Sequence, residues 1–120
     1  AEYPKTWADL VRVSQKLQKE GKVKWGFVGG LKYPHTWFTL LWSMWTNDCD
    51  LFSPYNERDN DVLAKNDWKS MLGEKCAREA MEFWWDNINT HKISPPALVS
   101  YTRTESDGIF MAGESFTSMG

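Results

Sequence analysis

The residue types that could recognise a ligand are concentrated in the segment 29–50. This segment carries aromatic and hydrogen-bonding side chains at Tyr33, His35, Trp37, Trp42, Trp45 and Asn47. Aromatic rings offer flat apolar platforms, and the Tyr, His and Asn groups add directional hydrogen bonds, a combination typical of a pocket for a polar solute. Aromatic helices are also common in hydrophobic cores, so the composition alone leaves both interpretations open.

Arrangements typical of catalysis are weak in this sequence. The two histidines, His35 and His91, have no serine or cysteine nucleophile pattern around them. Glu79 and Glu82 share a helix face, which indicates a solvated surface more than a catalytic pair. The glycines of residues 26–30 lack the spacing of a phosphate-binding motif. We therefore predict a binding protein and not an enzyme, and we expect no cofactor.

The cysteines and the acidic loop residues are the candidates for a cross-link or for metal ligands. Cys49 and Cys76 can form one disulfide if the protein is exported, and a buried free thiol is the alternative. Their spacing does not fit a zinc site. Glu57, Asp59 and Asp61 suggest a calcium loop, but the Gly and Glu that such a loop requires do not fall in place. We predict no metal site, with calcium as a minor alternative.

Composition and charge exclude several classes of function. The net charge is −2 and the basic residues are scattered, so nothing indicates nucleic-acid binding. No apolar run reaches the roughly 20 residues that span a bilayer. The sequence contains no signal peptide, as expected for a mature or excised segment. Eight tryptophans are unusually many for this length, and we expect most in the core and two or three facing a cleft.

Hydrophobic periodicity predicts alternating helices and strands in the first half of the chain. A helix capped by Thr6 runs to a stop at Gly21, and a short strand with one apolar face follows over residues 23–28. Thr36 is expected to cap the next helix, and a short extended piece begins at Leu51. The apolar face of that second helix is predicted to comprise Trp37, Leu40, Leu41, Met44 and Trp45.

The second half continues this pattern after a turn at 53–56 and a polar connection over 56–67. A helix follows Gly73, with an apolar stripe at Ala77, Ala80, Met81, Trp84 and Ile88. The prolines in 94–96 favour an extended or turn conformation. A final helix over 104–112, capped by Thr104 or Ser106, leads to a strand over 115–119. The order indicates an α/β class with short strands that do not make a complete fold.

Several short motifs occur in the order found in one protein family. In chain order they are the opening Pro4-Lys5-Thr6-Trp7-Ala8-Asp9-Leu10, the strand Trp25-Gly26-Phe27, Thr36-Trp37, Asp50-Leu51-Phe52, Ala80-Met81-Glu82-Phe83-Trp84, Ser94-Pro95-Pro96-Ala97 and Phe110-Met111-Ala112-Gly113-Glu114. This series resembles the second lobe of family 1 extracellular solute-binding proteins, the sugar-type receptors of bacterial ABC importers. Asp48-Cys49 stands where that family has a glycine pair.

The resemblance implies a fold and a function. It implies a periplasmic binding protein type II-like lobe, with residues 1–120 as part of the second (C-terminal) lobe and with the first lobe and hinge return absent. It further implies a carbohydrate or related polar solute bound between two lobes, with Tyr33, His35 and Trp37 as the main contacts. Delivery to ABC permease subunits at the membrane is expected, in the periplasm or outside the cell, with or without a lipid anchor.

Alternative interpretations remain at this point. A stand-alone carbohydrate-binding or protein-interaction module would use exposed tryptophans and bind without a second lobe. An enzyme built on the two-lobe fold would need catalytic groups outside this chain. An unpaired sheet edge would let the fragment self-associate.

Overall fold

The fold mixes helices and short strands in the order that the sequence predicts. A computed structural model describes residues 3–53 and 69–119. Its elements are α1 (Trp7–Lys19), β1 (Trp25–Val28), α2 (His35–Thr46), β2 (Phe52–Ser53), β3 (Lys69–Ser70), α3 (Lys75–Asn89), the 3-10 helix η1 (Pro96–Ser100), α4 (Arg103–Met111) and β4 (Ser115–Ser118). The α/β prediction is confirmed, and the strand β3 and the helix η1 are additions to it.

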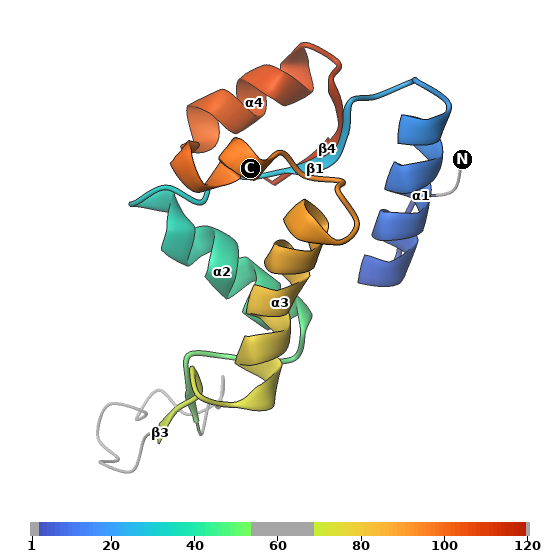
Figure 1. Ribbon diagram of the computed structural model, residues 1–120. Helices are drawn as coiled ribbons and strands as arrows, with labels where there is room; N and C mark the ends of the chain where they lie inside the picture. Colours follow the sequence, from blue (N-terminus) through green and yellow to red (C-terminus); the bar gives the residue numbers. More distant parts are fainter. Residues whose placement is uncertain (1–2, 54–68, 120) are drawn as a thin grey trace.

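The centre of the molecule is a parallel pair of strands. β1 and β4 pair in parallel, with Trp25 opposite Ser115 and Val28 opposite Ser118. On the other side of β1, the carbonyl oxygen of Ile93 accepts from the backbone N–H of Gly26 at 2.7 Å. In Figure 1, α4 lies above this pair of strands and α2 and α3 lie below it. β2 and β3 form a separate antiparallel pair.

β1 is buried on both faces, which corrects the prediction of a single apolar face. Gly26, Phe27 and Val28 are buried in succession. A strand of a parallel sheet is covered by helices on both sides, so its residues do not alternate between core and solvent. Gly26 is required here because a Cβ atom would lie 2.1 Å from Cβ of Ser14 in α1.

The core is assembled mainly around Phe27. Its ring stacks on Trp84 with centroids 4.9 Å apart. The buried residues of this main cluster are Leu10, Phe27, Val28, Phe83, Trp84, Ile93 and Leu98. Among the tryptophans of the described residues, Trp84 is buried while Trp37, Trp45 and Trp85 are exposed.

The ends of the first and last helices show where capping was predictable. The Thr6 hydroxyl accepts from the backbone N–H of Asp9 at 3.0 Å, which confirms the predicted cap. Gly21 ends the helical segment at φ +71°, a conformation that glycine adopts at little cost. The last helix is capped by Thr102 and not by Thr104 or Ser106, because the Glu105 carboxylate accepts from the backbone N–H of Thr102 at 2.9 Å.

The start and the buried face of α2 differ from the prediction. Thr36 does not cap the helix; Pro34 occupies the cap position, and the Thr36 hydroxyl donates to the carbonyl of Leu31. Trp37 and Trp45 are exposed, whereas Thr39 and Ser43 are buried. Small hydroxyl side chains pack where α2 approaches its neighbours closely, and each finds a hydrogen-bond partner there.

The buried face of α3 also differs in part from the prediction. Met81 is exposed and Phe83 is buried in its place, beside Ala77, Ala80 and Trp84. Phe83 lies against Trp7 of α1 and Phe27 of β1, so the core reaches α3 from two sides. After α3, Pro95 is extended as predicted, but the 3-10 helix η1 already begins at Pro96, because proline is tolerated in the first turn of a helix.

Several predictions concern residues that the structure does not describe. The turn over 53–56, the polar connection over 56–67 and the acidic residues Glu57, Asp59 and Asp61 lie wholly or mainly outside the described residues. Within 3–53 and 69–119, no group of three or more His, Cys, Asp or Glu side chains is placed to hold a metal ion. None of the helices in these two ranges is long and apolar enough to cross a bilayer.

Candidate solute-binding surface

The candidate surface lies where β1 and β4 end. The residues 29–34 lead from the end of β1 into α2, and Met119 follows the end of β4. Its backbone N–H donates to the carbonyl of Val28 at 2.9 Å, so the two strand ends lie side by side. Open α/β sheets bind ligands at the carboxyl ends of their strands. The aromatic and polar side chains near this edge are therefore the first candidates for ligand contacts.

The loop before α2 is held in place by backbone hydrogen bonds. The backbone N–H of Leu31 donates to Leu98 at 3.1 Å, and that of Lys32 donates to Tyr101 at 2.9 Å. The Thr39 hydroxyl reaches back to the carbonyl of Gly30 at 2.6 Å. A Cβ atom on Gly30 would lie 2.9 Å from the carbonyl carbon of Thr102, so only glycine permits this approach. These hydrogen bonds therefore hold the backbone of the loop, from which its side chains extend, in one conformation.

Three of the predicted contacts lie together at the start of α2. Tyr33 is 83% exposed and Trp37 is 51% exposed. His35 lies between them in sequence and is half-buried, and its Nδ1 atom is buried without a hydrogen-bond partner among the described residues. The sequence reasoning missed Phe38, which is 57% exposed and has its ring centroid 3.8 Å from that of Trp37. The sequence could have indicated Phe38, because it lies in the same helix turn as Trp37.

A cavity of about 680 Å³ lies at the end of β4, beside the start of α1 and the second half of α2, and its lining does not include Tyr33, His35 or Trp37. The predicted residue Trp42 lines it, together with the rings of Trp7 and Phe27. Hydroxyl groups of Thr46, Thr117 and Ser118 complete the lining. The Ser118 hydroxyl is buried without a partner among the described residues. These residues come from distant segments, so no sequence spacing could have indicated this cavity.

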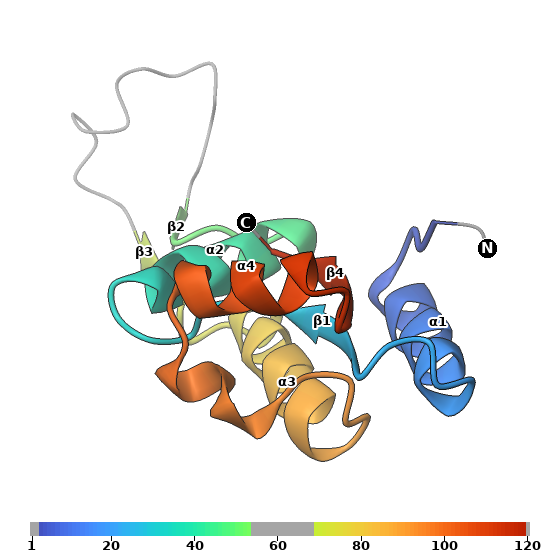
Figure 2. The same cartoon turned by 90° about the horizontal axis from the view of Figure 1, so that it is seen from above.

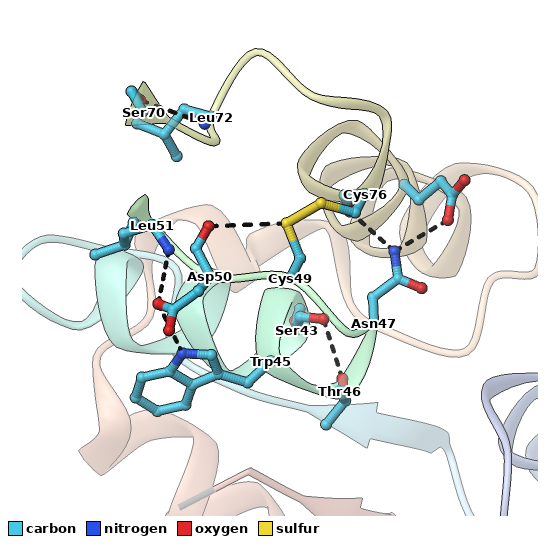
Figure 3. The surroundings of a disulfide bond; sticks show 11 residues. Ser43, Trp45, Thr46, Asn47, Cys49, Asp50, Leu51, Ser70, Leu72 and Cys76 are labelled. Atoms are coloured by element: carbon cyan, nitrogen blue, oxygen red, sulfur yellow. Dashed lines mark hydrogen bonds between the residues drawn. A yellow bond between two sulfur atoms is a disulfide. The ribbon is translucent and has the colours of Figure 1, made fainter. Parts of the chain in front are cut away.

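Trp45 and Asn47 lie at the other end of α2, beside a disulfide bond (Figure 3). The indole N–H of Trp45 donates to Oδ1 of Asp50 at 3.2 Å. Asn47 Nδ2 donates to the carbonyl of Cys76 at 2.9 Å and to Glu79 at 3.0 Å. The structure therefore separates these two residues from Tyr33, His35 and Trp37 and gives their polar groups partners within the chain.

The disulfide joins Cys49, just after α2, to Cys76 in the first turn of α3. The two Cα atoms are 5.7 Å apart, within the usual range for this bond. Met44, Cys49, Ala77 and Ala80 form a small buried cluster around it. The end of α2 is thus tied covalently to α3, while the start of α2 is held by loop hydrogen bonds.

The carboxylates with clearly shifted pKa values lie outside this surface. The backbone N–H of Lys5 lowers the pKa of Asp9, and hydrogen bonding to Lys22 lowers the pKa of Glu20. The Thr102 hydroxyl likewise lowers the pKa of Glu105 at the start of α4. All three carboxylates sit near helix ends and are at least partly exposed. The candidate surface is instead aromatic and hydroxyl-lined, which suits an uncharged polar ligand.

The fold is similar to a solved structure of T. maritima MalE3 with maltose bound. The TM-score is 0.75 at 25% sequence identity, over 95% of this chain. The chain spans about a quarter of that protein, since 26% of the MalE3 chain is covered. No protein-family model matches the sequence, and no curated protein matches it. The comparison confirms the resemblance to sugar-type solute-binding proteins, and the fold is that of part of a maltose-binding-protein lobe.

Proposed function

We propose that this chain is part of the second lobe of a solute-binding protein that holds a carbohydrate between two lobes and delivers it to a membrane permease. The observation that carries this proposal is the likeness of 95% of the chain to a maltose-bound protein. The chemistry of the strand ends supports it independently. Exposed rings lie around the start of α2, and hydroxyl groups of Thr46, Thr117 and Ser118 line the cavity to which Trp42 contributes.

Tyr33 and Trp37 are assigned to stacking on the apolar faces of sugar rings. Their large exposed rings supply contact area with little loss of conformational freedom. His35 is assigned to a sugar hydroxyl, as the family resemblance implies, because an imidazole ring can donate or accept a hydrogen bond. Trp42 is assigned to a deeper contact through the cavity that it lines.

The binding step involves no bond cleavage. A ligand that contacts both lobes favours the closed state by the difference between its affinities for the closed and open states. The closed receptor then docks on the permease subunits, as the family resemblance implies. One lobe offers only half of the contacts, so the isolated chain should bind sugars weakly.

The expected compartment is the periplasm or the cell exterior. A structural disulfide persists in oxidising compartments and is rare in the reducing cytosol. The bond between Cys49 and Cys76 supports export on this ground. The likeness to a maltose-bound protein also supports export from the cytosol.

The test is a titration of the chain with maltose and longer maltooligosaccharides, followed by NMR. We expect weak saturable shifts in residues 29–38, lost in Tyr33→Ala and in Trp37→Ala. Trp85→Ala is the matched control, because Trp85 is also an exposed indole but lies on α3. Loss of binding in all three variants, or shifts confined to other parts of the chain, would contradict the proposed surface.

The second candidate function is a stand-alone carbohydrate-binding module. The exposed and contacting rings of Trp37 and Phe38 favour it, because they already form a platform without a second lobe. The two candidates differ in affinity. A chain that binds as tightly as a longer protein carrying both lobes supports the module, and a chain that binds far more weakly supports the two-lobe receptor.

A further inference from the structure

The outward face of α2 carries aromatic rings and no charged side chain. Figure 1 and Figure 2 show this helix on the side of the molecule away from α1, and it contains no Lys, Arg, Asp or Glu. Phe38 and Trp45 are each 57% exposed. About two helical turns separate them, so they point to the same side of α2, about 10 Å apart along its axis. A surface helix normally carries charged side chains on its solvent side, so this face is a candidate binding surface.

Trp45 is held in a fixed orientation near the end of α2 (Figure 3). Its indole N–H donates to Oδ1 of Asp50 at 3.2 Å, and the same oxygen accepts from the backbone N–H of Leu51 at 2.7 Å. Cys49, the residue before Asp50, is bonded to Cys76 of α3. The chain around Asp50 is therefore anchored, and the exposed indole can bind a ligand with little loss of conformational freedom.

Trp45 and Asp50 together offer the chemistry that recognises a sugar. The exposed indole is a flat apolar surface on which the C–H face of a sugar ring can stack. The second carboxylate oxygen of Asp50, Oδ2, accepts no hydrogen bond from a residue of 3–53 or 69–119. A carboxylate oxygen accepts strong hydrogen bonds from hydroxyl groups. This pair therefore suits an uncharged ligand with several hydroxyl groups.

The position of Trp45 continues the candidate solute-binding surface along α2. Trp37 and Phe38 contact each other at the start of the helix, with ring centroids 3.8 Å apart. Trp37 is the proposed stacking residue of that surface. The distance of about 10 Å from Phe38 to Trp45 along the helix axis is comparable with the length of a disaccharide unit. A ligand that reaches both positions is therefore longer than a disaccharide.

We propose that Trp45 and Asp50 form a second sugar position and that the ligand is a linear oligosaccharide lying along α2. One sugar residue stacks on Trp37, and a later one stacks on the indole of Trp45 and donates a hydroxyl to Oδ2 of Asp50. This inference rests on the proposed function, because the first position is the one assigned there. It narrows the ligand from carbohydrates in general to chains longer than a disaccharide.

The test compares maltose with maltohexaose in NMR titrations of the unmodified chain. We expect maltose to shift resonances of residues 29–38 and not the indole N–H resonance of Trp45. Maltohexaose should shift both sets of resonances. It should also bind about fivefold to tenfold more tightly than maltose, because it adds one aromatic contact. The Trp45 resonance reports on the second position without any substitution.

Variants separate the second position from the first. Trp45→Ala should lower the ratio of the maltohexaose affinity to the maltose affinity about fivefold, because it removes the stacking ring. Asp50→Asn should lower this ratio to a smaller extent, since an amide oxygen still accepts from the indole but carries no charge. Trp85→Ala is the matched control, because Trp85 is an exposed indole on α3, and it should leave the ratio unchanged.

The outcomes distinguish this inference from the proposed function. Shifts in residues 29–38 without a response at Trp45 would overturn the second position and leave the proposed function standing. An affinity ratio that is the same in Trp45→Ala and in the unmodified chain would do the same. The absence of shifts with either sugar would overturn both. Self-association that is lost in Trp45→Ala, measured by sedimentation, would also overturn the inference, because a second copy of the chain would then cover this face.

Discussion

The indole N–H of Trp84 donates to the hydroxyl of Ser43 at 2.7 Å, and both residues are buried. This bond links α3 to α2 inside the core. The Ser43 hydroxyl in turn donates to the carbonyl of Thr39 at 2.9 Å, one turn earlier in α2. The chain can bury a tryptophan here because its N–H has a partner.

Ser43→Ala should destabilise the fold by about 1–3 kcal/mol, because it leaves the Trp84 N–H buried without an acceptor. The free energy of unfolding from urea titration measures this. Ser100→Ala is the control, since Ser100 is exposed and bonds only within η1. Similar small losses in both variants would show that the indole N–H finds another partner.

Two glycine substitutions should change the free energy of unfolding in opposite directions. Gly30→Ala should destabilise by about 1–3 kcal/mol, because its Cβ would meet the backbone of Thr102 and Arg103 at 2.9–3.0 Å. Gly108→Ala should stabilise by about 0.5–1 kcal/mol, because Gly108 lies in α4 with no atom within 4 Å of a Cβ. Thermal unfolding of both variants measures the difference. A stabilising Gly30→Ala would mean that the loop shifts freely.

Reduction of the disulfide should destabilise the chain by about 3–4 kcal/mol, on the chain-entropy estimate for a cross-link of this length. Cys49 and Cys76 are separated by 27 residues. Urea unfolding with and without reductant measures the effect. The double variant Cys49→Ser, Cys76→Ser is the control and should be insensitive to reductant. A reductant effect that persists in this variant would point to another cause.

The contact of Glu105 with Thr102 should make stability depend on pH in the acidic range. The Thr102 hydroxyl lowers the pKa of Glu105 below its ordinary value of 4.5. The folded state then binds this proton less readily than the unfolded state, so the stabilisation is present above that ordinary value. It is lost as the pH falls through the lowered pKa.

Glu105→Gln should therefore reduce the unfolding temperature more at pH 7 than at pH 3. Thr102→Ala, which removes the hydroxyl donor, should flatten the same pH profile in part. Differential scanning calorimetry across this range makes the measurement. A difference between Glu105→Gln and the unmodified chain that stays constant with pH would contradict the assignment.

Elements with strong local signals were predictable from the sequence. The first helix has a Thr6 cap, regular apolar spacing and a stop at Gly21, and all of these appear in the structure. The final strand was predicted over 115–119 and observed as Ser115–Ser118. Local hydrogen bonds and backbone preferences determine such features, so nearby residues are sufficient to indicate them.

The sequence also indicated the residue types of the candidate solute-binding surface, but not their arrangement in space. Six residues within one segment were predicted as contacts, and the structure groups Tyr33, His35 and Trp37 at the start of α2. Asn47 lies at the opposite end and bonds to Cys76 and Glu79. Closeness in sequence did not imply closeness in space, because a straight helix of this length separates its two ends by about 1.5 Å per residue.

The sequence by itself determined the order of the elements, the α/β class and the family resemblance, because these follow from local periodicity and short motifs. Only the tertiary structure decided which faces are buried, which strands pair and where cavities form. Those features depend on contacts between distant segments, such as Trp7 with Phe83 and Trp84 with Ser43. Burial is a property of the assembled helices and strands, so a tryptophan's environment cannot be known from its neighbours in sequence.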